Sequence, residues 1–436
     1  MQLRKFPILV GCAIFIVFLA AVVGRSEGWH GTTAGSALPL EEWAQVDAVA
    51  GRFTVYSYGR APYNRGAPFL TLPERRMFSD GAVAFTNHWP VITDVATGLA
   101  AGQSHQGPSC GGCHALDGRG RVHNMADLHM SGLSVPAPVA GATERVYRYP
   151  MYHDPNARRL DDVEWRTARR VTLPEGKTIE LVEPVALVDG QEMKLPLRTS
   201  PGVYGLGLIE LIPDADILAH AANGTGQARL SDVPGEEGRI ARFGWKAKFA
   251  TLDAQVRDAM VLELGLVDLS KDVGEESAAL VALETLLTDY IRMLAIPARR
   301  IDDETRILAG ARLFQDVGCI ECHKPAWETS SAPHIPKEYR GVAIYPFSDF
   351  LLHDMGPALA EPGGSPDASF WRTPPLWGIG AQQGVVPGVG FLHDGRARTL
   401  TEAILWHGGA AQASTNRFET LSARDRADLM DFLDSL

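Results

Sequence analysis

The chain has 436 residues, of which 41 are lysine or arginine and 52 are aspartate or glutamate, so its formal net charge is −11. With 45% hydrophobic and 21% charged residues, the composition excludes a wholly disordered or fibrous protein, and the length suggests two or three domains. The excess of acidic residues argues against a nucleic-acid-binding protein, which needs a basic face, and leaves room for a cationic protein partner.

The N-terminus has the pattern of an export signal. Arg4 and Lys5 precede an apolar run over residues 6–23, which is long for the core of a cleaved signal and just long enough to span a bilayer. We therefore predict that residues 1–26 are a signal peptide or an anchor in the inner membrane, and that the rest of the chain lies in the periplasm. A core helix at this end of the chain is the alternative.

Hydrophobic periodicity predicts the elements that follow. The helical period is found at 40–49, 75–89, 214–221, 251–264, 277–294 and 302–319. Residues 145–200 instead alternate apolar and polar side chains between Gly and Pro breaks, which predicts strands and hairpins. Ser422, with Asp425 three residues on, is predicted to cap the last helix, whose Leu429 and Phe432 share one face.

Two Cys-x-x-Cys-His motifs carry the chemistry: Cys110, Cys113 and His114, and again Cys319, Cys322 and His323. In such a motif two thiols on one turn can add to the two vinyl groups of a haem, and the histidine lies under the iron as its proximal ligand. We therefore predict two covalently bound c-type haems.

Two alternatives use the same cysteines. A zinc site from two Cys-x-x-Cys pairs usually spaces them about 15–20 residues apart and needs no histidine directly after each pair. A thioredoxin-like redox pair needs a βαβ context, which neither motif has. The fifth cysteine, Cys12, lies in the export segment, so no cysteine remains for a disulfide or a catalytic thiol. Covalent haem attachment also requires export, so the two signals agree.

Around these motifs the sequence resembles the di-haem oxidoreductase family, the relatives of bacterial di-haem cytochrome c peroxidases and MauG-type enzymes. The resemblance covers roughly residues 75–436 and is strongest towards the C-terminus. It rests on SCGGCHALDGRG (109–120), RFGWKA (242–247), SDFLLHDMG (348–356), WRTPPLW (371–377), FLHDGR (391–396) and EAILWHGG (402–409).

The resemblance implies a mainly α fold, with two cytochrome-c-like haem domains, a β-rich insertion and long ordered loops. The segments expected after residues 1–26 are an N-terminal haem domain (27–140), a β-rich insertion (141–235), a helical connector with an inter-haem tryptophan (236–300) and a C-terminal cytochrome-c-like haem domain (301–436).

The same resemblance suggests the distal ligands of both haems. The relatives place the sixth ligand of the C-terminal haem about fourteen residues after a His-Asp-Gly motif, and fourteen residues after His393 is His407. Met355 and His353 are its rivals, and a surface or helix-capping role for His407 is a further alternative. For the N-terminal haem, the relatives place a displaceable histidine near His129, unless that residue merely lines a loop.

Three more residues match positions of the relatives between and beside the haems. Trp245 corresponds to an inter-haem tryptophan that relays electrons. Gln255 stands ten residues later, as in the relatives, and Glu263 would be the acid–base group for peroxide, although its spacing from Gln255 is two residues shorter than theirs. A core tryptophan and a solvent-facing glutamate are the structural alternatives.

The resemblance therefore implies an exported di-haem oxidoreductase of peroxidase type, which takes electrons from a cytochrome c or similar donor and reduces peroxide or another small oxidant. A non-catalytic di-haem electron carrier and a MauG-type enzyme that oxidises a partner protein are the alternatives. The relatives also hold calcium between their domains. No acidic cluster supports calcium in this sequence, where only backbone carbonyls near Gly388 and Gly390 could contribute.

Overall fold

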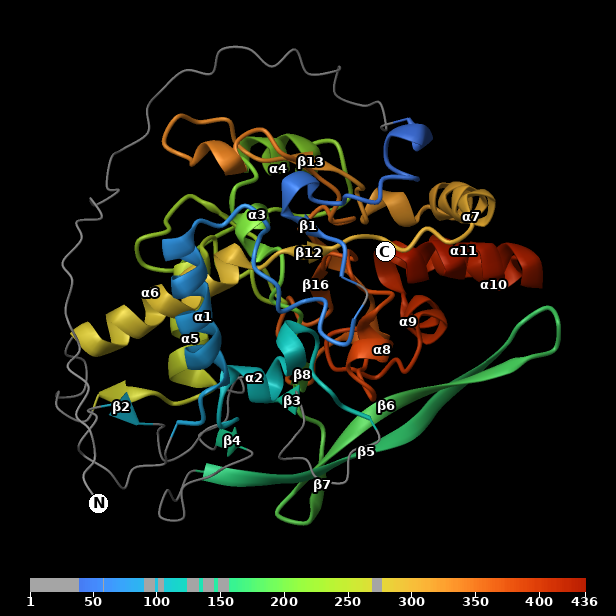
Figure 1. Ribbon diagram of the computed structural model, residues 1–436. Helices are drawn as coiled ribbons and strands as arrows, with labels where there is room; N and C mark the ends of the chain where they lie inside the picture. Colours follow the sequence, from blue (N-terminus) through green and yellow to red (C-terminus); the bar gives the residue numbers. More distant parts are fainter. Residues whose placement is uncertain are drawn as a thin grey trace. The chain divides into compact units, whose positions relative to one another are not determined.

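The helices surround the two motifs. The computed structural model describes residues 39–57, 59–89, 99–100, 106–123, 133–135, 145–147, 157–268 and 277–436. Its helices are α1 (Leu72–Thr86), α2 (Cys110–Cys113), α3 (Leu206–Glu210), α4 (Asp214–Ala221), α5 (Leu252–Leu262), α6 (Ala278–Met293), α7 (Glu304–Asp316), α8 (Gln382–Val385), α9 (Leu400–Trp406), α10 (Gln412–Thr420) and α11 (Ala423–Ser435) (Figure 1). The predicted export segment 1–26 and His129 lie outside the described residues.

Within the described ranges, no helix has both the length and the apolar character needed to cross a membrane.

Side-chain caps set where several helices begin. The hydroxyl of Ser422 accepts a hydrogen bond from the Asp425 N–H at 3.1 Å, as the sequence predicted. Asp303 caps α7, and Thr251 caps α5. The helix predicted at 40–49 is wrong: only a short 3₁₀ turn forms there, at Leu40–Glu42.

The strands are mostly very short. They are β1 (Thr54–Val55), β2 (Leu99–Ala100), β3 (Leu133–Ser134), β4 (Arg145–Tyr147), β5 (Ala157–Thr172), β6 (Thr178–Val188), β7 (Gln191–Met193), β8 (Arg198–Thr199), β9 (Arg229–Leu230), β10 (Ile240–Ala241), β11 (Val267–Asp268), β12 (Ile296–Pro297), β13 (Trp327–Glu328), β14 (Ala343–Ile344), β15 (Leu352–Asp354) and β16 (Phe370–Arg372). Two-stranded pairs dominate, and the largest sheet has the order β4-β5-β6-β7.

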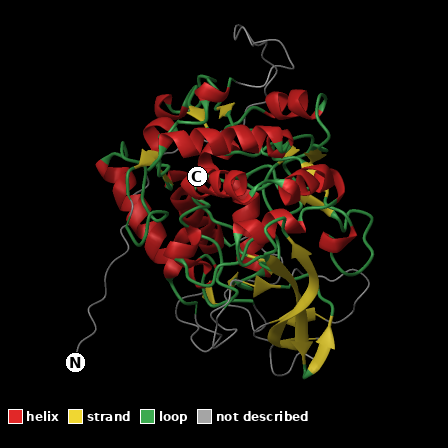
Figure 2. Ribbon diagram, turned by 90° about the vertical axis from the view of Figure 1, so that its right-hand side faces the viewer, coloured by secondary structure: helices red, strands yellow, loops and turns green. Residues whose placement is uncertain are grey.

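The long β5–β6 hairpin confirms the strands predicted for 145–200. Its antiparallel register runs from Leu160 opposite Val188 to Thr172 opposite Thr178. Figures 1 and 2 show the hairpin extending along one side of the helical part of the molecule. It is fastened to the C-terminal helices, because Leu181 is fully buried in their core and Glu175 in the hairpin turn pairs with Arg426 of α11.

The fold class expected from the resemblance is wrong. The structure is 37% helical and 18% strand, with several small sheets, so it is mixed α and β rather than mainly α. The described residues do not show two cytochrome-c-like domains, and Leu38–Leu436 pack as one compact unit. Many strands are two-residue pairs between segments far apart in sequence, such as Thr54 opposite Ile296. Tertiary contacts create such pairs, so local periodicity cannot predict them.

Two large hydrophobic clusters support the two motifs. The first joins α1, α5 and α6 through residues such as Phe85, Val256 and Tyr290, and Cys110 packs against it. The second joins α7, α9 and α11 through Phe314, and Cys319 packs against it. Each motif therefore stands on its own packed group of helices.

Helices α7 and α11 cross with almost no space between their backbones. A side-chain methyl at Gly310 of α7 would collide with the carbonyl oxygen of Asp428 and lie 2.6 Å from the Cβ of Phe432. The glycine is therefore required by packing. Because α7 leads directly into the second motif, this crossing fixes the position at which the motif begins, at Cys319.

We expect Gly310→Ala to destabilise the folded protein by about 1–3 kcal/mol, because the added methyl forces two packed backbones apart. Equilibrium unfolding in urea measures the change. Gly384→Ala in α8 is the matched control, since nothing lies within 4 Å of that position. The control should change stability by less than about 1 kcal/mol. Equal stability of both variants would contradict the crossing.

Candidate functional site

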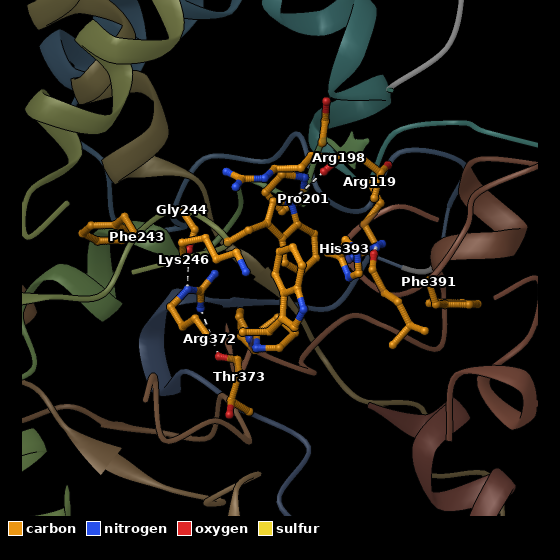
Figure 3. A pocket seen from close by; sticks show the side chains of 18 of the residues that line it. Arg119, Arg198, Pro201, Phe243, Gly244, Lys246, Arg372, Thr373, Phe391 and His393 are labelled. Atoms are coloured by element: carbon orange, nitrogen blue, oxygen red, sulfur yellow. Dashed lines mark hydrogen bonds between the residues drawn. The ribbon is translucent and has the colours of Figure 1, made fainter. Parts of the chain in front are cut away.

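A single cavity of about 890 Å³ is lined by residues of both Cys-x-x-Cys-His motifs. This is near the upper end of the range for ligand pockets. Its wall also includes one face of α5, the loop 198–204, the segment 371–377 and the end of α9. Figure 3 shows part of this wall.

A backbone carbonyl orients the histidine of the first motif. Ser109 caps α2 through a hydrogen bond from the Gly112 N–H at 3.0 Å, and His114 follows the helix. Its Nδ1 lies 2.6 Å from the carbonyl oxygen of Pro201. Because a carbonyl can only accept, Nδ1 carries the hydrogen and Nε2 keeps the lone pair that a metal needs. Burial lowers the pKa of His114 to about 4, so the ring is neutral.

The second motif repeats this arrangement. Gly318, at a φ of 91°, ends α7 and turns the chain into the 3₁₀ turn Cys319–Glu321. The Nδ1 of His323 lies 2.9 Å from the carbonyl oxygen of Phe347. Burial lowers the pKa of His323 to about 4. Both motif histidines are thus neutral imidazoles with Nε2 available as a ligand.

The four cysteines are free thiols. Burial raises the pKa values of Cys110, Cys319 and Cys322 to about 12, so these groups are protonated at neutral pH. In the described part of the chain, the one group of at least three metal-ligating side chains that come close together is Cys322, Asp349 and His353. Among the described residues, no such group joins the two cysteine pairs.

His407 reaches the same cavity from the end of α9. Its Nδ1 lies 2.6 Å from the carbonyl oxygen of Ala403, so its Nε2 is also the nitrogen that keeps a lone pair. Burial lowers the pKa of His407. It lies close enough to the second motif that its charge would lower the pKa of His323.

The rivals of His407 differ in how they are held. His353 is engaged on both ring nitrogens, with Nε2 2.7 Å from Asp349 and Nδ1 3.5 Å from the sulfur of Cys322. Met355 lines the cavity as well. Because the carboxylate of Asp349 can accept the Nε2–H of His353, the lone pair of that ring lies on Nδ1, next to Cys322. Both His353 and Met355 therefore remain rivals of His407.

The structure brings Trp245, Gln255 and Glu263 to one cavity. The indole N–H of Trp245 donates to the carbonyl oxygen of Thr199 at 2.8 Å, which fixes the ring. The Oε1 atom of Gln255 is buried without a hydrogen-bond partner. The carbonyl oxygen of Glu263 accepts from the Gln106 N–H at 2.8 Å, so this end of α5 lies beside the segment that leads into the first motif.

The C-terminal part of the chain can now be compared with known families. Residues 241–436 match the family "Di-haem oxidoreductase, putative peroxidase". The match confirms the resemblance and includes Trp245, Gln255, Glu263, the second motif and His407, whereas the first motif lies outside it. No curated protein matches the chain. A solved structure of hydrazine synthase from Kuenenia stuttgartiensis, pressurised with xenon, is similar at 17% identity and a TM-score of 0.39, over 96% of this chain and 99% of that one.

The residues present fit the haem groups that this di-haem family implies. Two neutral imidazoles carry a lone pair on Nε2, and two pairs of thiols line the wall of one cavity. The unpartnered Oε1 of Gln255 is what a wall left open for a ligand would show, because buried polar atoms are otherwise hydrogen-bonded.

Sequence reasoning missed a cluster of cations and aromatic rings in the same wall. The ammonium of Lys246 lies 3.5 Å from the ring centre of Trp371, and His393 stacks on that ring at 3.6 Å. The guanidinium of Arg119 lies 5.4 Å from the ring centre of Trp245, and the backbone N–H of Arg372 donates to the carbonyl oxygen of Trp245 at 3.0 Å. Both arginines line the cavity (Figure 3). The blocks RFGWKA, WRTPPLW and FLHDGR contain most of these residues, but spacing alone gave them no role.

Proposed function

We propose that the protein is an exported di-haem c-type oxidoreductase of peroxidase type, which uses electrons from a cytochrome c or similar donor to reduce peroxide. The observation that carries the proposal is that both Cys-x-x-Cys-His motifs and the trio Trp245, Gln255 and Glu263 line one cavity. The family match supports the oxidoreductase class. When bound, the haems would supply irons that exchange electrons and bind the oxidant.

Covalent attachment fits the state of the cysteines. Cys110, Cys319 and Cys322, whose pKa values are raised to about 12, are poor nucleophiles and poor redox couples. All four motif thiols nevertheless line the cavity, where they are placed to become thioethers. His114 and His323 would be the proximal ligands. Since this attachment takes place after export, the N-terminal segment 1–26 and the periplasmic location belong to the same proposal.

The two ends of the cavity support different tasks. Next to the second motif, His323 and His407 both offer Nε2, which suits a six-coordinate haem that only passes electrons. Next to the first motif, α5 contributes Gln255, with its unpartnered oxygen, and Glu263. We assign peroxide reduction to this end and electron entry to the other.

The side chains of α5 and Trp245 would serve the reaction in stated ways. Peroxide, two electrons and two protons give two waters. The carboxylate of Glu263 would take the proton from one peroxide oxygen and return it to the other as the O–O bond breaks. Gln255 would orient the oxidant, and the fixed indole of Trp245 would lie on the electron path between the two ends.

Removing one pair of thiols tests covalent attachment. The wild-type protein should be heavier than its mature polypeptide by the mass of two haems and should stain for haem on a denaturing gel. The double variant Cys110→Ala, Cys113→Ala should lose one of them, because no thioether can then form at the first motif. Mass spectrometry counts the haems. Two covalent haems in the double variant would contradict the assignment of the first site.

Replacing the proposed acid–base group tests the peroxidase activity. Glu263→Gln should lower kcat/KM for peroxide about 10²–10⁴-fold, the usual range for loss of a general acid–base group. Stopped-flow oxidation of a reduced cytochrome c measures it. Glu419→Gln on α10, outside the cavity wall, is the control and should leave the rate unchanged.

Two outcomes of that experiment would contradict the proposal. A wild-type protein that stays fully low-spin through half-reduction and does not react with peroxide would be an electron carrier. Unchanged kcat/KM in Glu263→Gln would leave the enzyme class standing but remove this residue from the mechanism.

The distal position of the C-terminal haem is tested at His407. His407→Gly should open the site, giving a high-spin ferric signal that added imidazole returns to low-spin. His407→Met should keep six ligands but raise the potential, because thioether sulfur favours ferrous iron. Electron paramagnetic resonance and redox titration follow both changes. Met355→Gly is the matched comparison, and if it alone alters the spectrum, then Met355 is the ligand.

A further inference from the structure

Two buried guanidinium groups in the cavity wall have no carboxylate partner. Arg119 and Arg372 are 8% and 7% exposed, and both line the cavity. In the described part of the chain, neither forms a salt bridge with a carboxylate. Arg119 donates to the carbonyl oxygens of Gly390 and Leu392. Arg372 donates to those of Gly244 and Thr373.

The neighbouring cations of the same wall are neutralised. Arg198 forms a two-pronged pair with Glu361 at 2.8 and 3.1 Å, and the ammonium of Lys246 lies 3.4 Å from the same carboxylate. The charge of Asp349 raises the pKa of Arg372, but the Asp349 carboxylate is hydrogen-bonded to His353 and not to the arginine. The absence of a carboxylate partner is therefore particular to Arg119 and Arg372 among these four cations.

Carbonyl oxygens alone leave the charge of a buried cation uncompensated, and this is costly in a protein interior. Burial accordingly lowers the pKa of each guanidinium to about 10. An anion in the cavity would remove that cost. A planar carboxylate matches the fork of a guanidinium better than a spherical ion does.

The positions of the two arginines indicate what would carry the carboxylates. Arg119 stands five residues after His114 and lies 5.4 Å from the ring centre of Trp245. The backbone N–H of Arg372 donates to the carbonyl oxygen of Trp245 at 3.0 Å, and its guanidinium donates to that of Gly244 at 2.8 Å. Both cations thus lie beside Trp245 in the wall of the cavity that the two motifs share.

We propose that Arg119 and Arg372 form a carboxylate-binding site beside Trp245 that holds propionate groups of the two haems. This rests on the proposed function, because it requires haem in the cavity. The site would turn the propionate edges of the haems towards the tryptophan, and its two positive charges would favour the ferrous state.

The test compares Arg119→Gln and Arg372→Gln with wild type in the exported, haem-loaded protein. Each substitution should raise the ferric-to-ferrous ratio of a haem, at a fixed potential, by on the order of tenfold. This corresponds to a reduction potential lower by about 59 mV for a one-electron couple. The propionate bending bands in the resonance Raman spectrum should also shift. Arg119→Lys and Arg372→Lys retain the charge and should restore most of the potential, while the Raman bands stay altered because the fork is lost.

Arg299→Gln is the matched control. Arg299 is 2% exposed and, within the described residues, also forms no salt bridge with a carboxylate. It is not among the residues that line the cavity, and its guanidinium donates to three carbonyls and to Ser435. Its replacement should leave both potentials and the Raman bands unchanged. If a Gln variant fails to fold, the Lys variant decides the matter: altered bands support the proposal, and unaltered bands overturn it.

The remaining outcomes separate this site from the function on which it rests. Haem counting comes first, and a wild-type protein without haem would refute the proposed function itself. With two haems present, wild-type potentials and Raman bands in both Gln variants would overturn the propionate site alone. A saturable spectral response to formate that is lost in the Gln variants would show that soluble carboxylate, not propionate, occupies the site, and would overturn the assignment.

Discussion

The proposed chemistry depends on one kind of hydrogen bond, from a histidine Nδ1 to a backbone carbonyl. Pro201, Phe347 and Ala403 supply the carbonyls for His114, His323 and His407. A carbonyl cannot donate, so each bond fixes the tautomer and leaves Nε2 with its lone pair. Two separate loops supply the carbonyls of Pro201 and Phe347, and α9 supplies that of Ala403. At Phe347 the backbone is held at a φ of 53°, which few residues other than glycine adopt, and the side chain is fully buried among aromatic rings.

Because loops orient the ligands, the helices act mainly as a support. Helices α7 and α11 touch at Gly310, and α1 meets α6 at Gly81, where a methyl group would lie 2.5 Å from the Cβ of Tyr290. These glycines let two helices approach closely behind each motif. The β5–β6 hairpin adds to the support, since Arg169 donates to the carbonyl of Leu405, two residues before His407.

The parts of the site that depend on neighbouring residues could be predicted from the sequence, whereas those that depend on contacts between distant segments could not. Local signals identified the two motifs, the helices α4 to α7 and the hairpin, because thiol spacing and periodicity are properties of neighbouring residues. The mixed fold was missed, since its short strand pairs join distant segments. Arg119 and Arg372 were missed for a related reason. Their significance lies in what they lack, a carboxylate partner, and only the packed structure shows which partners a buried charge has.

The cations of the cavity wall also distinguish its two central tryptophans. The ammonium of Lys246 lies 3.5 Å from the ring centre of Trp371, whereas Arg119 is 5.4 Å from that of Trp245. A positive charge on a ring face stabilises the neutral ring and opposes the loss of an electron, and the effect falls with distance. Trp371 is therefore the harder of the two to oxidise. If a carboxylate also neutralises Arg119, the difference grows, which agrees with the proposed place of Trp245, rather than Trp371, on the electron path.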